Sequence, residues 1–141
     1  MAADILVMDE NASLGFPFVK LGVVPDGGAS FLLQAKASPA IALDVLLSGG
    51  VIQAKEARAL GLTRRVVAAG ELEKHVMKIA EELASLPAEA LQLTKSLCAQ
   101  AWAAHLSGAL RHEADAFGLA TASEGHRTAL AAAKARLRKA E

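Results

Sequence analysis

The sequence predicts an α/β protein in which a few short strands come first and helices make up most of the remainder. The apolar runs between residues 4 and 24 are short and rich in β-branched residues, which favours strands and loops. After Gly28, apolar residues recur at helical spacing almost to the end of the chain. The 141 residues are 53% hydrophobic but only 4% aromatic, so one modest core filled by Leu, Val and Ala is expected.

The first half is expected to contain one strand around Ile5-Leu6-Val7, three short helices and a second strand. Pro39 is well placed to begin a helix, because proline lacks only an N–H that the first turn does not use. Gly49 and Gly50 are suited to end that helix, because glycine accepts left-handed backbone. The expected helices cover residues 28–37, 39–48 and 53–60, and the second strand ends at Val67.

The second half is expected to be helical. An amphipathic helix follows Gly70, with one apolar face formed by Leu72, Val76, Ile79 and Leu83. Another helix is predicted to start at Pro87, and a further helical pattern surrounds Gly108. Ser123 is expected to cap a last helix whose end carries several basic residues, a favourable arrangement with the helix dipole. Trp102 and Phe117 are expected to anchor the core or a subunit interface, and Cys98 to be a buried, inert thiol.

Composition argues against several classes of partner. Fifteen basic residues balance fifteen acidic ones, so neither nucleic acid nor an anionic membrane is favoured as a partner. No apolar run is long enough to span a bilayer, and one cysteine cannot form an internal disulfide. The four histidines lack the paired spacing of a metal site. A cytoplasmic protein without a metal is expected.

The segment from Phe16 to Gly28 contains the strongest candidate for chemistry. Pro25-Asp26-Gly27 places one carboxylate on a tight turn that opens a helix. On its own, this pattern is typical of a solvated turn. A carboxylate at such a position is also a candidate general base. The residues alone leave both interpretations open.

Six motifs follow one another over essentially the whole chain, namely Asn11-Ala12-Ser13-Leu14-Gly15-Phe16-Pro17-Phe18, Leu21-Gly22-Val23-Val24-Pro25-Asp26-Gly27-Gly28, Ala42-Leu43-Asp44-Val45-Leu46-Leu47-Ser48-Gly49, Ile52-Gln53-Ala54-Lys55-Glu56-Ala57, Arg65-Val66-Val67 and Pro87-Ala88-Glu89-Ala90-Leu91. Their order resembles the middle and end of the enoyl-CoA hydratase/isomerase (crotonase) superfamily.

The resemblance implies a crotonase (ClpP-like) ββα spiral of which only the second half is present. Residues 1–70 would form the end of the spiral core, and residues 71–141 a helical tail that builds a homo-oligomer, a trimer or a dimer of trimers. In the family, two backbone N–H groups form an oxyanion hole for the thioester carbonyl, and neither of their segments matches this sequence. We therefore expect a truncated family member that is inactive alone, since losing one such donor costs about 10²–10³ in rate.

The resemblance also implies acyl-CoA chemistry, with the coenzyme A thioester as substrate and no cofactor. The family's hydratases carry an acid after the proline that matches Pro17, whereas this chain has Phe18, which cannot transfer a proton. Asp26 matches the acid of a subgroup similar to the Δ3,Δ2-enoyl-CoA isomerases and ring-epoxyphenylacetyl-CoA isomerases, and the resemblance implies a role in fatty-acid metabolism such as β-oxidation. Asp26 is therefore the predicted catalytic residue. The predicted substrate-binding residues are Phe18, Leu21, Gly22, Pro25, Gly27, Gly28, Phe31 and Lys134. Lys134 matches a position that, in the family, lies near the nucleotide phosphate of coenzyme A.

An aspartate in water is a weak base, so an isomerase site needs an apolar wall to make it a stronger one. The expected wall consists of Phe16, Phe18, Val23, Val24 and Phe31. Two alternatives remain: a non-catalytic assembly module that keeps only the helical tail, and an enoyl-CoA hydratase. An in-frame glycine-rich segment encoded upstream of Met1 would favour a truncated enzyme over the module.

Overall fold

The computed structural model describes residues 1–139, which contain four short strands and six α-helices, whereas two or three strands are expected from the sequence. The strands at 13–15 and 51–53 have only three residues each, too few to give a recognisable alternating pattern. The strands are β1 (Val7–Asp9), β2 (Ser13–Gly15), β3 (Val51–Gln53) and β4 (Arg65–Val67). The helices are α1 (Ala29–Lys36), α2 (Pro39–Ser48), α3 (Ala54–Ala59), α4 (Leu72–Ala84), α5 (Ala88–Thr121) and α6 (Glu124–Leu137), and a short 3₁₀ helix, η1, covers Phe18–Leu21.

The strands pair far along the chain and form two small sheets. β1 runs parallel to β4 with Met8 opposite Val66, and β2 runs antiparallel to β3 with Leu14 opposite Ile52. Two-stranded sheets are marginal by themselves and need helices packed against them. Both sheets therefore depend on the helices that pack against them.

The core lies in the first half of the chain, between these sheets and helices α1 to α3. Its centre is formed by fully buried side chains, namely Leu33, Ala42, Ile52, Ala54 and Ala57. Phe16 is the one aromatic ring in this buried cluster. The expected core of aliphatic residues and alanine is confirmed.

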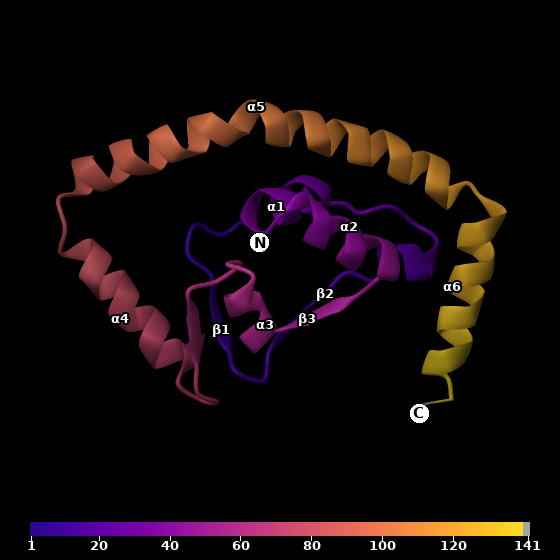
Figure 1. Ribbon diagram of the computed structural model, residues 1–141, viewed down its shortest axis with the longest axis horizontal. Coiled ribbons are helices and arrows are strands. Elements are labelled where there is room, and N and C mark those ends of the chain that lie inside the picture. The colour runs from indigo at the N-terminus through magenta and orange to yellow at the C-terminus, as the bar shows by residue number, and fades with distance from the viewer. Residues whose placement is uncertain (140–141) are drawn as a thin grey trace.

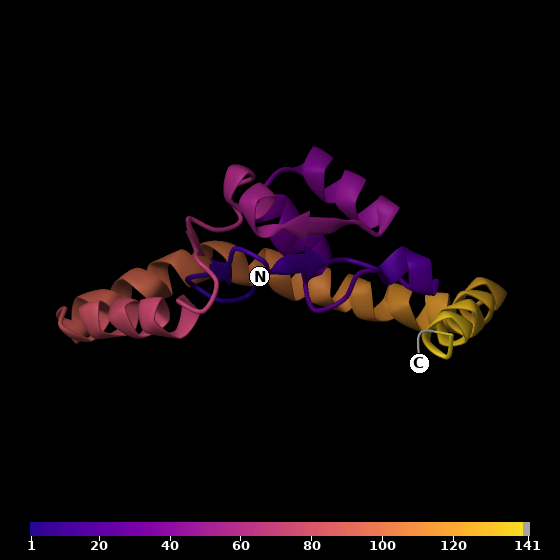
Figure 2. The same cartoon turned by 90° about the horizontal axis from the view of Figure 1, so that it is seen from below.

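The second half forms an arch around that core. The 34-residue helix α5 spans the top of Figure 1, and α4 and α6 descend from its two ends. Figure 2 shows the three helices lying in one layer, from which α1, α2 and α3 project to one side. The arch brings the middle of α5 against α1, and α6 against η1.

Most expected helix ends are found, and the proline, serine and glycine residues that predicted them take the expected positions. Pro39 is the first residue of α2, Ser38 Oγ accepts a hydrogen bond from the Ile41 N–H, and Gly49 ends the helix with a φ of 61°. Ser123 Oγ accepts from the His126 N–H and so caps α6 as predicted.

Two expectations are corrected. The helical patterns that start at Pro87 and surround Gly108 belong to one continuous helix, because a single glycine costs only about 1 kcal/mol in a helix interior. Cys98 is exposed, as are all residues of α5 from 92 to 105. No helix among residues 1–139 combines the length and apolar character that a membrane crossing requires.

Candidate functional site

The turn that carries Asp26 lies where α5 crosses the start of α1. Val23 is buried, Asp26 and Gly27 are exposed, and Gly28 is buried again immediately before α1 begins. Gly27 and Gly28 have φ values of 61° and 81°, a left-handed conformation that L-residues other than glycine rarely adopt. The two glycines therefore let the chain reverse sharply and leave the Asp26 side chain exposed at the turn.

Gly28 also lets the turn approach α5 closely. A Cβ atom at Gly28 would lie 2.8 Å from Leu106 Cδ1, closer than carbon atoms normally come. Leu106, Leu110, Glu113 and Phe117 recur at helical spacing and so share one face of α5. This face covers the turn.

Asp26 and Gly27 line a pocket of about 310 Å³ together with this face of α5. The other lining residues are Leu110, Glu113, Ala114 and Phe117. The pocket thus combines an exposed carboxylate with an apolar wall. None of the five residues expected to form that wall lines this pocket: Phe16 is part of the core, Phe18 packs against the core, and Val24 and Phe31 face a neighbouring pocket.

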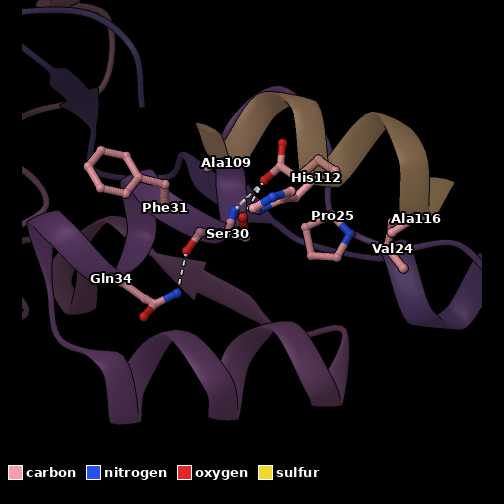
Figure 3. A pocket seen from close by; sticks show the side chains of 9 residues that line it. Val24, Pro25, Ser30, Phe31, Gln34, Ala109, His112 and Ala116 are labelled. Carbon is pink, nitrogen blue, oxygen red and sulfur yellow. Dashed lines mark hydrogen bonds between the residues drawn. The ribbon is translucent and has the colours of Figure 1, made fainter. Parts of the chain in front are cut away.

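A second pocket, of about 360 Å³, lies next to the first, between α1 and α5 (Figure 3). Pro25 and Phe31 line it, with Ser30 and Gln34 on α1 and His112 on α5. Phe31 meets the Trp102 ring edge-on at a centroid distance of 5.7 Å and stacks with His105 at 6.3 Å. Trp102 thus contacts Phe31 from α5, but it is 37% exposed and is not part of the buried core, one of the two roles expected for it.

Glu113 joins the two pockets, because its side chain lines both. Its carboxylate accepts hydrogen bonds from the Gly28 N–H at 2.7 Å, the Ser30 N–H at 2.9 Å and the Ser30 hydroxyl at 2.5 Å. Glu113 is only 7% exposed. The carboxylate accepts hydrogen bonds from N–H groups at the start of α1 that have no acceptor within the helix. The helix dipole also favours negative charge at this position.

The other predicted site residues lie along the chain before this turn. Leu21 ends η1, and its carbonyl oxygen accepts a hydrogen bond from His126 Nδ1 at 2.8 Å. Gly22 has a φ of 67°, and a Cβ there would lie 2.6 Å from the His126 Cα. Leu21 and Gly22 therefore dock α6 and do not line the pockets at Asp26.

Lys134 is exposed near the end of α6 and lines neither pocket. The structure thus brings together Pro25, Asp26, Gly27, Gly28 and Phe31, and it leaves Phe18 and Lys134 apart from them. Among residues 1–139, no group of three or more His, Cys, Asp or Glu side chains is arranged to hold a metal ion.

The specific role of Glu113 is not evident from the sequence, although the chain contains a signal for it. An acid that stands between Leu110 and Phe117 on an apolar helix face is unusual, because burial of a carboxylate needs partners. Those partners lie 85 and 83 residues away, so the sequence alone does not identify them.

Known proteins share both this sequence pattern and this fold. A family model described as Enoyl-CoA hydratase/isomerase matches residues 1–138. The chain is 33% identical over 132 residues to a crotonyl-CoA hydratase of Syntrophomonas wolfei. The matched region covers 94% of this chain and 51% of that protein.

Two solved structures superpose closely. An enoyl-CoA hydratase from Mycobacterium avium subsp. paratuberculosis K-10 gives a TM-score of 0.90 at 34% identity, covering 96% of this chain and 55% of the other. An enoyl-CoA hydratase/isomerase from Pseudoalteromonas atlantica T6c gives 0.90 at 28% identity, covering 95% and 54%. The chain spans about half the length of these relatives. Sequence and fold together show that this chain belongs to the enoyl-CoA hydratase/isomerase family.

Proposed function

We propose that the protein moves the double bond of an enoyl-CoA thioester, with Asp26 as the single group that carries the proton. Asp26 would take a proton from C2 of a 3-enoyl thioester, and the electron pair would delocalise into a dienolate. The same carboxyl group would then return the proton at C4, which leaves the double bond between C2 and C3. The observation that carries this proposal is the exposed Asp26 carboxylate in a pocket with an apolar wall.

The apolar wall supports this role because it offers the acyl chain an apolar surface beside the exposed carboxylate. Leu110, Ala114 and Phe117 on α5 supply it. Within this pocket Glu113 is the other acid, and both of its oxygens already accept hydrogen bonds. A mechanism that needs one free acid therefore suits the site better than one that needs two.

The dienolate also needs hydrogen-bond donors at the thioester oxygen. We propose that a segment outside this sequence supplies them. The chain's coverage of about half of its relatives is compatible with that proposal.

Substrate contacts are proposed for two regions. Gly27 shares the pocket of Asp26, Pro25 and Phe31 line the neighbouring pocket, and Gly28 adjoins Asp26 in the turn, so these residues would contact the acyl group. Phe18, Leu21, Gly22 and the exposed Lys134 would act at a greater distance from Asp26, with Lys134 meeting a phosphate of coenzyme A. No cofactor besides the coenzyme A of the substrate is required by this reaction.

The test is the Asp26→Asn variant of the full-length protein, assayed for conversion of 3-enoyl-CoA to 2-enoyl-CoA. An amide cannot take the C2 proton, so kcat is expected to fall by about 10²–10⁴. The control is Asp115→Asn, which removes an exposed acid from α5 and is expected to leave kcat unchanged. Equal turnover by Asp26→Asn and the unmodified protein would remove Asp26 from the mechanism.

Hydration is the second candidate, because the relatives described above are named hydratases. Addition of water to 2-enoyl-CoA would be expected to use a second acid, and Phe18 stands where the resemblance places one. The same full-length protein should therefore hydrate 2-enoyl-CoA far more slowly than it isomerises 3-enoyl-CoA. Faster hydration than isomerisation would favour the second candidate.

We also propose that copies of the protein associate, as a trimer or a dimer of trimers. Large apolar side chains exposed on α4 and α5 support association.

A further inference from the structure

Glu113 is, among the described residues, the one buried side chain that carries a full charge. Burial of a carboxylate is costly unless hydrogen bonds replace its water. Glu113 lines the Asp26 pocket, but both of its carboxylate oxygens already accept hydrogen bonds. The proposed proton transfer therefore does not use Glu113. Its position therefore calls for another role.

All three hydrogen bonds to Glu113 come from the residues that follow Asp26. Gly28 donates its N–H to Oε2, whereas Ser30 donates both its N–H and its hydroxyl to Oε1. The Asp26 carbonyl oxygen accepts from the Ala29 N–H at 3.0 Å. The backbone from Asp26 to Ser30 is thus held at both ends, by its own turn and by α5.

We propose that Glu113 is a positioning residue for Asp26, which tethers the 26–30 turn to α5 and so sets the distance between the Asp26 carboxylate and the apolar wall. This inference rests on the proposed function of Asp26. The wall and the tether belong to the same face of α5, because Leu110 and Phe117 lie three residues before and four after Glu113. One helix therefore carries the wall and also holds the acid in front of it.

A carboxylate is the side chain that suits this tether. All three partners are donors, and an ionised carboxylate offers two acceptor oxygens. A glutamine at this position would present its NH₂ group to one of these donors and lose at least one hydrogen bond. An aspartate would be shorter by one methylene and would not reach both N–H groups.

The first test is Glu113→Gln in the full-length protein. We expect kcat for isomerisation to fall by about 10- to 100-fold, because a displacement of about 1 Å at a reacting group has effects of this size. The KM should stay within about threefold, because the wall that contacts the acyl chain remains. Asp115→Asn, on the same helix, should change neither value. Ser30→Ala, which removes one of the three bonds, should give a smaller loss of kcat with the same KM.

The second test combines Glu113→Gln with Asp26→Asn. If Glu113 acts through Asp26, the double variant should be no slower than Asp26→Asn alone. Losses that multiply would overturn the inference, as would a Glu113→Gln variant that raises KM and leaves kcat unchanged.

Amide hydrogen exchange tests the tether even if Asp26 proves to have no catalytic role. Glu113→Gln should speed exchange at Gly28 and Ser30 by about tenfold or more, with α2 amides unaffected as the internal reference. Unchanged protection at Gly28 and Ser30 would overturn the tether itself. If Asp26→Asn keeps full activity while the amides of Glu113→Gln exchange faster, the proposed function fails and the tether stands.

Discussion

At the scale of single residues, the site depends on backbone that only glycine adopts easily. Gly27 and Gly28 both have positive φ, but their surroundings differ. A Cβ at Gly27 would meet nothing within 4 Å, whereas one at Gly28 would meet Leu106 at 2.8 Å. The same substitution at the two positions therefore separates backbone strain from close packing against α5.

Gly28→Ala should destabilise the protein more than Gly27→Ala. Each alanine costs about 1–2 kcal/mol for left-handed backbone. Gly28→Ala should cost about 1 kcal/mol more, because Leu106 must move. Urea unfolding of the two variants measures this difference, and equal free energies of unfolding would mean that α5 does not press on the turn.

The residue scale also marks the limit of prediction from sequence. Asp26 and its glycines were identifiable because Pro-Asp-Gly-Gly is a local signal that a single segment contains. The apolar residues that line the Asp26 pocket are not those expected, because they lie on α5, 84 or more residues after Asp26 in the sequence. Glu113 was recognisable as an acid on the tail helix, but its bonds to Gly28 and Ser30 depend on tertiary contact.

At the scale of elements, local signals predicted the short helices well. Pro39, Gly49 and Ser123 act within one helical turn, so their effects are independent of the rest of the fold. The continuity of α5 from Pro87 through Gly108 is not evident from local signals, since it depends on the whole length of the helix and on its contacts with α1 and α6. The exposure of Cys98 likewise depends on which part of α5 the core reaches.

The docking of α6 on η1 is an element-scale feature that can be tested. Gly22→Ala would place a Cβ 2.6 Å from the His126 Cα. Because the Cα belongs to the backbone of α6, the clash cannot be relieved by rotating a side chain. We expect α6 amides to exchange at least tenfold faster in this variant, since the helix must move away from η1. The matched control is Gly70→Ala, which has the same positive φ but open space around it. Equal α6 protection in both variants would contradict this account of the docking.

At the scale of the whole molecule, the arch leaves much apolar surface uncovered. Leu97 is 69% exposed and Leu119 78%, and no residue of α4 is buried. Helix α5 packs on the core through its α1-facing stripe, so its outer face has no partner within the described residues. Exposed apolar surface of this kind favours association in water.

The chain is therefore expected to self-associate in sedimentation experiments. Replacing Leu93 and Leu97 with glutamine should weaken association by at least tenfold, because both lie on the same exposed face of α5. Ala99→Gln adds the same side chain without removing a large apolar one and should have little effect. A stable monomer of the unmodified chain would contradict this expectation.

Removal of the C2 proton of the acyl thioester is the step assigned to Asp26, and deuterium exchange from solvent follows that step. The full-length protein is incubated with 3-enoyl-CoA in D₂O, and deuterium at C2 and C4 is followed by mass spectrometry and NMR. Because the Asp26 carboxyl group is exposed, the proton that it takes from C2 exchanges with D₂O before one is returned at C4. The unmodified protein should therefore incorporate deuterium, and Asp26→Asn should do so at least about 10²-fold more slowly. Incorporation at the same rate in both proteins would show that another group moves the proton.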